Sequence, residues 1–329
     1  MWIDAFWLVI GLVAILWGAN LLTDGASALA KRWGMSDLVV GLTVVAFGTS
    51  APELVISVMS AASGNAGIAI GNVVGSNIFN VFVIIGITAM LRPIVIERSI
   101  LTKDIPLVII ASIALLAMGN APILEGASAR ILDRVDGIIL LLFFAIFMRH
   151  TFSQAQTAEA SGESASLPEA SEGKARKEMG IGKAILWVAI GLALLIGGGD
   201  RFVDGASGLA SGFGVSDAII GLTIVAAGTS LPELATSVAA ALKGKPGIAI
   251  GNVIGSNIFN IFMVLGLSGV IRPLPFGSVD NTDLLTMTVA AIMFWAFGWW
   301  WKERTITRIE GAILTACYVG YISYRLYLL

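Results

Sequence analysis

Residues 41–54 read GLTVVAFGTSAPEL and residues 67–80 read GIAIGNVVGSNIFN; near copies follow as GLTIVAAGTSLPEL at 221–234 and GIAIGNVIGSNIFN at 247–260. The offset is 180 residues in both cases, and the same offset relates Arg92-Pro93 to Arg272-Pro273. Each stretch is apolar enough for a membrane interior, yet each carries polar residues in its middle. The chain is therefore organised as two similar halves around a duplicated, partly polar core.

The composition is that of a polytopic membrane protein, with 57% hydrophobic and 13% charged residues. No basic stripe is present, so we do not expect a nucleic-acid partner. The expected surroundings are the lipid bilayer. Cys317 and His150 are the single cysteine and histidine, which excludes a disulfide framework and a Cys/His metal cluster. We expect an all-α membrane protein.

Ten apolar segments approach the length that a hydrocarbon core of about 30 Å requires. They cover approximately 4–29, 37–62, 67–91, 104–119, 131–148, 183–209, 217–242, 247–271, 282–301 and 307–327. Residues 149–182 break the pattern because they are rich in Ala, Ser, Glu and Gly, which is typical of a flexible linker. The predicted domains are thus 1–148, the linker 149–182, and 183–329, with five transmembrane helices in each half.

Because five is odd, equivalent helices of the two halves cross the membrane in opposite directions, which predicts an inverted-topology repeat. If the N- and C-termini lie outside, the linker is cytoplasmic and 15 of the 20 Lys and Arg residues fall on the cytoplasmic side. That bias agrees with the positive-inside rule. The basic pair Lys31-Arg32 is replaced by Ser211-Gly212 in the second half, as inversion requires.

The second span carries a proline at position 52, which has no N–H to donate and therefore weakens the helix beside Glu53. Thr49 and Ser50 lie four and three residues before Glu53, on the same helical face. The third span adds a polar stripe of Asn72, Ser76 and Asn80, with Gly75 placed to interrupt it, and the second half repeats all of these features. We therefore predict broken helices 2, 3, 7 and 8, whose exposed carbonyls are tolerated only where they line a cavity.

Glu53 and Glu233 are the strongest functional candidates, because a carboxylate at the bilayer centre costs about 2.5–3.5 kcal/mol. An inverted repeat would bring the two together at the midplane. Their neighbours offer hydroxyl, amide and carbonyl oxygens, a ligand set that suits Ca²⁺, Na⁺ or Mg²⁺. Two carboxylates would neutralise one divalent ion, or the same oxygens would hold several Na⁺ ions. Asp24 and Asp204 fall near span ends, where an interfacial role is expected.

Two other functions are less consistent with the sequence. GGGD at 197–200 matches an element of intramembrane aspartyl proteases, but a second aspartate in a matching span is missing. A passive channel would use similar oxygens, but unlike an exchanger it would conduct ions without a counter-ion. Glycine and serine patterns taken singly are typical of helix packing rather than of ion binding.

The duplicated GTSAPEL, GTSLPEL and GSNIFN motifs resemble the two α-repeats of the sodium/calcium exchangers, within the cation/Ca²⁺ antiporter superfamily. The resemblance implies that Glu53 and Glu233, with the carbonyls of Thr49 and Thr229, bind Ca²⁺. It further implies flanking Na⁺ ligands and pocket-lining residues at Thr49, Ser76, Thr229, Ser256, Ala46, Ala226, Ser50, Ser230, Asn80 and Asn260. Asn260 departs from many relatives, which carry aspartate there.

The resemblance to prokaryotic, short-linker exchangers implies an antiporter rather than an enzyme, which carries Na⁺ and Ca²⁺ as transported ions and has no prosthetic group. It implies alternating access in a prokaryotic inner membrane, exchange of three Na⁺ for one Ca²⁺ with Ca²⁺ export, and function as a monomer. An H⁺/Ca²⁺ exchanger, or a K⁺-dependent variant, remains the alternative, because the same glutamates could carry protons and Asn260 alters the site.

Overall fold

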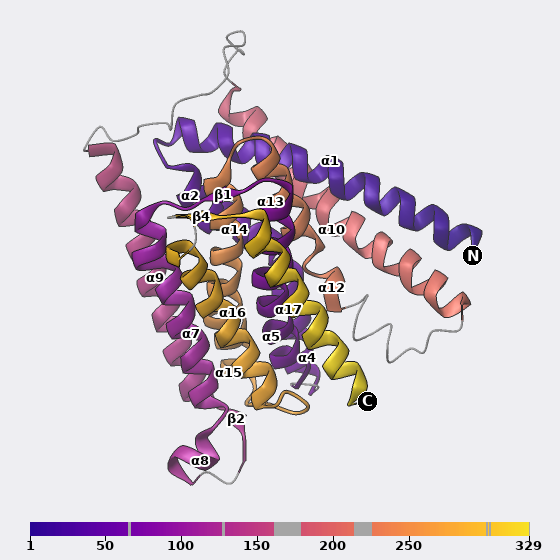
Figure 1. Cartoon of the computed structure of the whole chain (residues 1–329), viewed down its shortest axis with the longest axis vertical. Helices are drawn as coiled ribbons and strands as arrows, with labels where there is room; N and C mark the ends of the chain where they lie inside the picture. The colour runs from indigo at the N-terminus through magenta and orange to yellow at the C-terminus, as the bar shows by residue number, and fades with distance from the viewer. Residues whose placement is uncertain are drawn as a thin grey trace.

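Helices make up most of the computed structural model, which describes residues 1–64, 67–126, 129–160, 179–213, 226–300, 302 and 304–328 (Figure 1). The first half contains α1 (Trp2–Arg32), α2 (Asp37–Val40), η1 (Gly41–Val45), α3 (Ala46–Thr49), α4 (Ala51–Ser63), α5 (Gly67–Phe79), η2 (Asn80–Ile85), α6 (Gly86–Leu91), β1 (Ile94–Val95), η3 (Ile100–Asp104), α7 (Ile105–Met118), α8 (Ala121–Glu125), β2 (Ile131–Leu132) and α9 (Arg134–Ala160). The second half contains α10 (Ile181–Gly212), α12 (Ala226–Gly228), α13 (Leu231–Leu242), α14 (Pro246–Ile258), η5 (Phe259–Leu265), α15 (Gly266–Ile271), β3 (Leu274–Pro275), α16 (Asn281–Trp300), β4 (Thr305–Ile306) and α17 (Arg308–Tyr327).

Seven of the described helical segments are long and apolar enough to cross a membrane, and a bent pair makes an eighth. The bent pair is Asp37–Thr49 with Ala51–Ser63, which meet at 48°. The expected counterpart at 217–242 lies partly outside the described residues, and its described part is the shorter apolar helix Leu231–Leu242. The fold is thus an all-helical membrane bundle with about seven to eight apolar spans in its described part.

The centre of the bundle is formed by two equivalent spans, Gly67–Leu91 and Pro246–Ile271, which are almost entirely buried. Both spans are continuous, so the prediction that helices 3 and 8 are broken was wrong. Each instead widens into a π-helical stretch, η2 or η5, where the duplicated motif reaches Asn80 or Asn260. Such stretches frequently mark functional sites within helices.

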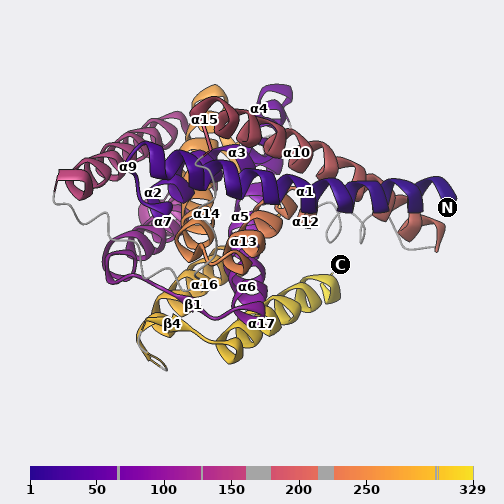
Figure 2. The same ribbon diagram turned by 90° about the horizontal axis from the view of Figure 1, so that it is seen from above.

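The long helices α1 and α10 run antiparallel beside each other and extend away from the bundle in both views (Figures 1 and 2). Glycines allow their backbones to approach closely: a Cβ at Gly18 would lie 2.8 Å from the Gly191 carbonyl oxygen, and one at Gly191 would lie 2.7 Å from the Leu22 nitrogen. This is the small-residue packing expected inside membranes, where lipid supplies no hydrophobic drive for helix association.

Within the described residues, four two-residue strands, which the sequence pattern did not predict, join the halves at opposite ends of the bundle. β1 pairs with β4 at one end, called the linker end below because α9 finishes and α10 starts there, and β2 pairs with β3 at the other, called the far end. Arg92 and Arg272, each followed by proline, adopt extended backbone and end the preceding helices. β1 and β3 are 180 residues apart, and each pairs with a strand of the other half.

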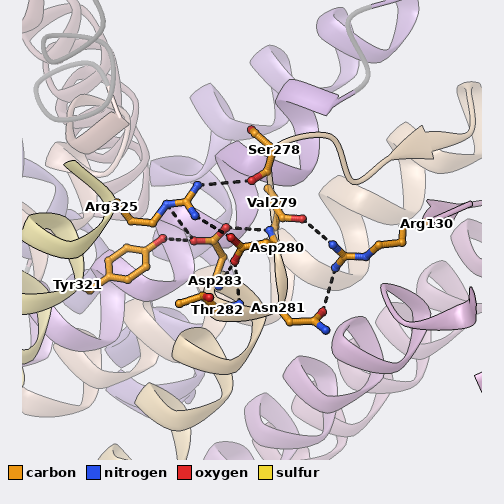
Figure 3. Close-up of polar contacts among 9 residues, drawn as sticks. All are labelled: Arg130, Ser278, Val279, Asp280, Asn281, Thr282, Asp283, Tyr321 and Arg325. Atoms are coloured by element: carbon orange, nitrogen blue, oxygen red, sulfur yellow. Dashed lines mark hydrogen bonds and ion pairs between the residues drawn. The ribbon is translucent and has the colours of Figure 1, made fainter. Parts of the chain in front are cut away.

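At the far end, charged side chains connect the start of α16 to the end of α17 (Figure 3). Arg325 contacts Asp280 at 3.0 Å and Asp283 at 3.5 Å, and the Tyr321 hydroxyl donates to Asp283 at 2.8 Å. Desolvation opposes ionisation of Asp280, but the N–H groups of Asp283 and Thr282 and the Arg325 charge outweigh it, so the pKa of Asp280 is lowered. The cluster fixes two neighbouring helices relative to each other.

A second polar group at the far end joins the segment after α8 to the start of α16 (Figure 3). Arg130 donates to the carbonyl of Val279 and to the side-chain oxygen of Asn281, both at 3.1 Å. Asn120 and Asn281 exchange two amide hydrogen bonds of 3.0 and 2.9 Å.

α9 extends into the segment predicted as a linker. Residues 149–160 continue this helix, because the polar residues after His150 include good helix formers. Residues 161–178 lie outside the described residues, so the prediction of a flexible linker there is not tested.

Candidate ion-binding site

The bend in the second span places Glu53 in the first turn of α4. Ser50, at the bend, has backbone angles outside the helical range, and Pro52 occupies the first turn of the new helix. The second half repeats this arrangement, with Ser230 preceding α13 and Glu233 in its first turn. The predicted breaks of helix 2 and, within the described residues, of helix 7 therefore lie beside the glutamates.

Serines from each half contact the glutamate of the other half. The Ser50 hydroxyl donates to Glu233 Oε1 at 2.9 Å, and the Ser230 hydroxyl donates to Glu53 Oε1 at 3.4 Å. All four side chains are buried. The tertiary structure thus brings the two motifs, 180 residues apart, into one site.

Asparagines of the central spans hold the first turns of α4 and α13. The Asn72 amide donates to the Glu53 carbonyl at 3.3 Å and to the Ser57 hydroxyl at 3.1 Å. The Asn252 amide donates to Glu233 and Ser237 in the same way, at 3.2 and 3.0 Å. These bonds use backbone carbonyls next to the helix break and so fix the direction in which each glutamate leaves its helix.

Asn77 and Asn257, which the sequence analysis did not select, hold the amides of the predicted site residues Asn80 and Asn260. The Asn80 amide nitrogen donates to Asn257 Oδ1 at 3.0 Å, and the Asn260 amide nitrogen donates to Asn77 Oδ1 at 3.1 Å. The Asn77 amide also donates to the Asn257 carbonyl at 3.2 Å. The duplicated GSNIFN motif contains all four residues, and their three-residue spacing was the available signal.

Four buried carboxylate and amide oxygens in this region have no hydrogen-bond partner among the described residues: Glu53 Oε2, Glu233 Oε2, Asn80 Oδ1 and Asn260 Oδ1. A buried acceptor without a partner costs about 1–3 kcal/mol, and more when it is charged. Because the four are two carboxylate and two amide oxygens, they form a set that a hard cation satisfies. No group of three or more His, Cys, Asp or Glu residues occurs in the described ranges, so the further ligands of such a cation would have to be neutral oxygens.

The other predicted residues surround these oxygens. Ser76 donates to Glu53 Oε1 at 3.5 Å, and the Ser256 hydroxyl lies 2.9 Å from the Ser50 hydroxyl, to which it donates because the Ser50 proton is directed at Glu233. The Ala46 carbonyl accepts from the Ser50 backbone nitrogen at 3.0 Å and, at 3.4 Å, from the hydroxyl of Thr49. Ala226 is the first residue of α12, directly after the gap at 214–225, and Thr229 follows α12.

The two threonines differ in their surroundings. Thr49 is fully buried and donates to Asn252 Oδ1 at 3.0 Å. Thr229 is only partly buried, and its hydroxyl has no hydrogen-bond partner in the described part of the chain. Lys243, at the end of α13 in the second half, pairs with Asp24 at 2.8 Å and thereby ties α13 to α1. The predicted interfacial role of Asp24 agrees with this contact.

The chain resembles known exchangers over almost its full length. A family model described as sodium/calcium exchanger protein matches residues 3–152 and 183–327. The sodium/calcium exchanger MaX1 of Methanosarcina acetivorans is 32% identical, with 98% of each chain covered. The inner membrane protein YrbG of Escherichia coli is 34% identical, over 96% of this chain and 94% of its own.

Among solved structures, the sodium-calcium exchanger NCX_Mj, soaked with Na⁺ and Ca²⁺, matches with a TM-score of 0.80. It is 29% identical, and the match covers 97% of each chain. Both the family and the fold are those of membrane transporters that exchange ions as substrates, and not those of enzymes. The chain belongs to the sodium/calcium exchanger protein family.

Proposed function

We propose that the chain is a secondary active antiporter that exchanges Na⁺ for Ca²⁺ by alternating access. The observation that carries this proposal is the set of four buried, unpartnered oxygens supplied by Glu53, Glu233, Asn80 and Asn260. Ca²⁺ coordinates six to eight oxygens, and the nearby hydroxyls and carbonyls supply the remainder.

Charge explains why the two ions exclude each other at this site. The two carboxylates neutralise one Ca²⁺, whereas Na⁺ ions would share them with neutral oxygens such as those of Thr49, Ser76 and Ser256. Occupancy by one set raises the electrostatic cost of adding the other. Mutual exclusion of this kind is what couples the two fluxes.

The proposed topology has ten spans in two inverted five-helix repeats, 1–148 and 183–329, with both termini outside and the linker in the cytoplasm of a prokaryotic cell. Support comes from the reciprocal contacts: Ser50 with Glu233 mirrors Ser230 with Glu53, and Asn80 with Asn257 mirrors Asn260 with Asn77. Adding 180 to the number of one residue and subtracting it from that of its partner turns each contact into the other. A twofold axis between the halves produces such paired contacts. The Lys and Arg bias gives the orientation.

The moving part in this proposal is the α1–α10 pair. Its glycine contacts make the two helices one unit, and this unit packs more loosely on the bundle than the two helices pack on each other. Sliding of the pair past the fixed site would open the site to one side of the membrane at a time. We expect a single chain to be sufficient for this movement. With three Na⁺ per Ca²⁺, one net charge crosses per cycle, worth about 2.3 kcal/mol per 100 mV. An inward Na⁺ gradient would then drive Ca²⁺ export.

Uptake of radioactive Ca²⁺ into Na⁺-loaded proteoliposomes tests the proposal. We expect uptake that collapses when the Na⁺ gradient is removed. A pH jump in Na⁺-free buffer tests the H⁺/Ca²⁺ alternative, which the same carboxylates could serve, and added K⁺ tests the K⁺-dependent one. Uptake that ignores every counter-ion gradient would contradict antiport and favour a channel.

A further inference from the structure

The side-chain amides of Asn80 and Asn260 are held in one orientation by asparagines of the opposite half. Each amide nitrogen donates to the side-chain oxygen of its partner, Asn257 or Asn77, at 3.0 or 3.1 Å. All four residues are buried, with at most 2% of their surface exposed, so water cannot replace these bonds. An amide has an acceptor on one side and a donor on the other, so fixing the nitrogen also fixes the oxygen.

Reversal of either amide would be unfavourable. It would turn Asn80 Oδ1 toward Asn257 Oδ1, so that two acceptors would face each other without a proton between them. In the observed orientation Asn80 Oδ1 and Asn260 Oδ1 have no partner within the described residues, although both are buried. Asn80 follows Ser76 by one helical turn, and Ser76 contacts Glu53. The unsatisfied oxygens therefore belong to the region of the glutamates.

We propose that Asn77 and Asn257 are positioning residues, which hold two neutral amide oxygens in place as cation ligands without touching the cation. This inference rests on the proposed cation site and deepens it. It also gives a physical role to the amide at position 260: aspartate there has no N–H to offer Asn77 Oδ1, whereas asparagine completes the same bond that Asn80 makes in the other half. The site thereby retains two carboxylates and two oriented neutral oxygens.

The test measures Ca²⁺ binding by the purified full-length chain in detergent, from the rise of its thermal unfolding midpoint with Ca²⁺ concentration. Asn257→Ala removes the acceptor for Asn80, and Asn77→Ala removes the acceptor for Asn260. Each change should weaken the apparent Ca²⁺ affinity roughly tenfold, because a buried orienting bond is lost. Asn257→Asp keeps an acceptor at that point and should stay within about threefold of the wild type.

The double variant Asn80→Asp with Asn257→Ala separates orientation from packing. A carboxylate presents oxygen whichever way it turns, so adding Asn257→Ala to Asn80→Asp should weaken Ca²⁺ binding far less than it does in the wild type. Asn281→Ala breaks a distant amide pair with Asn120 and serves as the matched control, with no expected change in affinity.

The outcomes are distinct. If both alanine variants lower the midpoint without Ca²⁺ but keep wild-type affinity, the two asparagines only support packing and the inference is overturned. Equal losses in the wild-type and Asn80→Asp backgrounds would overturn it as well. Wild-type Ca²⁺ binding without Na⁺-driven flux would contradict the proposed exchange while leaving this inference in force. If one alanine variant does not fold, the variant of the other half decides.

Discussion

The two halves of the site carry the same motif but use it differently. In the first half the Ser50 backbone nitrogen bonds to the carbonyl four residues earlier, and Thr49 reaches Asn252 in α14. In the second half the Ser230 nitrogen bonds to the carbonyl only three residues earlier, and the Thr229 hydroxyl has no partner in the described ranges. Thus the GTS–PEL turn of the first half is bonded to the central span through Thr49, whereas the Thr229 hydroxyl of the second half makes no such bond within the described residues.

Glycines of α14 explain how closely the second span of the first half packs against this helix. A Cβ at Gly251 would lie 2.6 Å from the Leu38 carbonyl oxygen, and one at Gly255 would lie 2.6 Å from that of Leu42. Only glycine permits this approach of α14 to the second span. At the equivalent Gly71 a Cβ would meet Val279 Cγ2 at 3.8 Å, and at Gly75 it would meet no described atom within 4 Å. Within the described residues, the halves can be compared at the threonines, serines and asparagines of the site.

The largest expected effect concerns the feature that the halves share. Glu53→Gln and Glu233→Gln should each reduce Na⁺-driven Ca²⁺ uptake at least a hundredfold, because one buried charge no longer balances Ca²⁺. Ser63→Ala serves as a control, since this exposed hydroxyl bonds only its own helix. Normal exchange after either glutamate substitution would remove that residue from the mechanism.

The next effect should separate the halves. Thr49→Val removes a buried hydroxyl that donates to Asn252, so we expect a loss of about 1 kcal/mol in the free energy of unfolding. Thr229→Val removes a hydroxyl without a described partner and should change stability by less than half as much. Thermal unfolding of both variants without Ca²⁺ compares them directly. Equal losses would show that the observed difference between the halves does not persist in solution.

A smaller effect is expected at the linker end. Lys243→Gln removes the ion pair with Asp24, and also the bond from Lys243 to the Asn20 carbonyl at 2.9 Å, which together hold α13 to α1. Because both side chains are partly exposed, the loss should be no more than about 1 kcal/mol and should shrink at high salt. The first half has Ser63 in the position equivalent to Lys243 and so lacks this contact. A salt-independent loss would point to a contribution other than the ion pair.

The smallest effect belongs to the far-end cluster. Because the folded-state pKa of Asp280 lies below its unfolded value, ionisation of Asp280 stabilises the protein above the unfolded pKa of about 3.9, and this stabilisation fades as pH falls through the folded value. Arg325→Gln should therefore flatten the decline of the unfolding midpoint in acid. An unchanged acid profile in the variant would show that Arg325 does not contribute to the shift.

Much of the site could be predicted from the sequence, because its residues sit in long duplicated motifs. Glu53 and Glu233 stand beside prolines in apolar spans, and the polar stripe through Asn80 was visible from its spacing. Asn77 and Asn257 were missed because their role depends on which side chain of the other half they face. The predicted breaks in helices 3 and 8 were wrong because a glycine does not have to interrupt a helix: Gly255 lies inside a continuous span and serves close packing against Leu42.

Composition, repeat and spacing are local properties, and they were enough to indicate a membrane protein with a duplicated core, hard oxygen donors and two glutamates among them. The folded chain adds which serine reaches which glutamate, which way the amides of Asn80 and Asn260 turn, and which threonine bonds to the central span. The physical reason is that these bonds join residues far apart in the chain, and two nearly identical motifs can differ only through what packs against them.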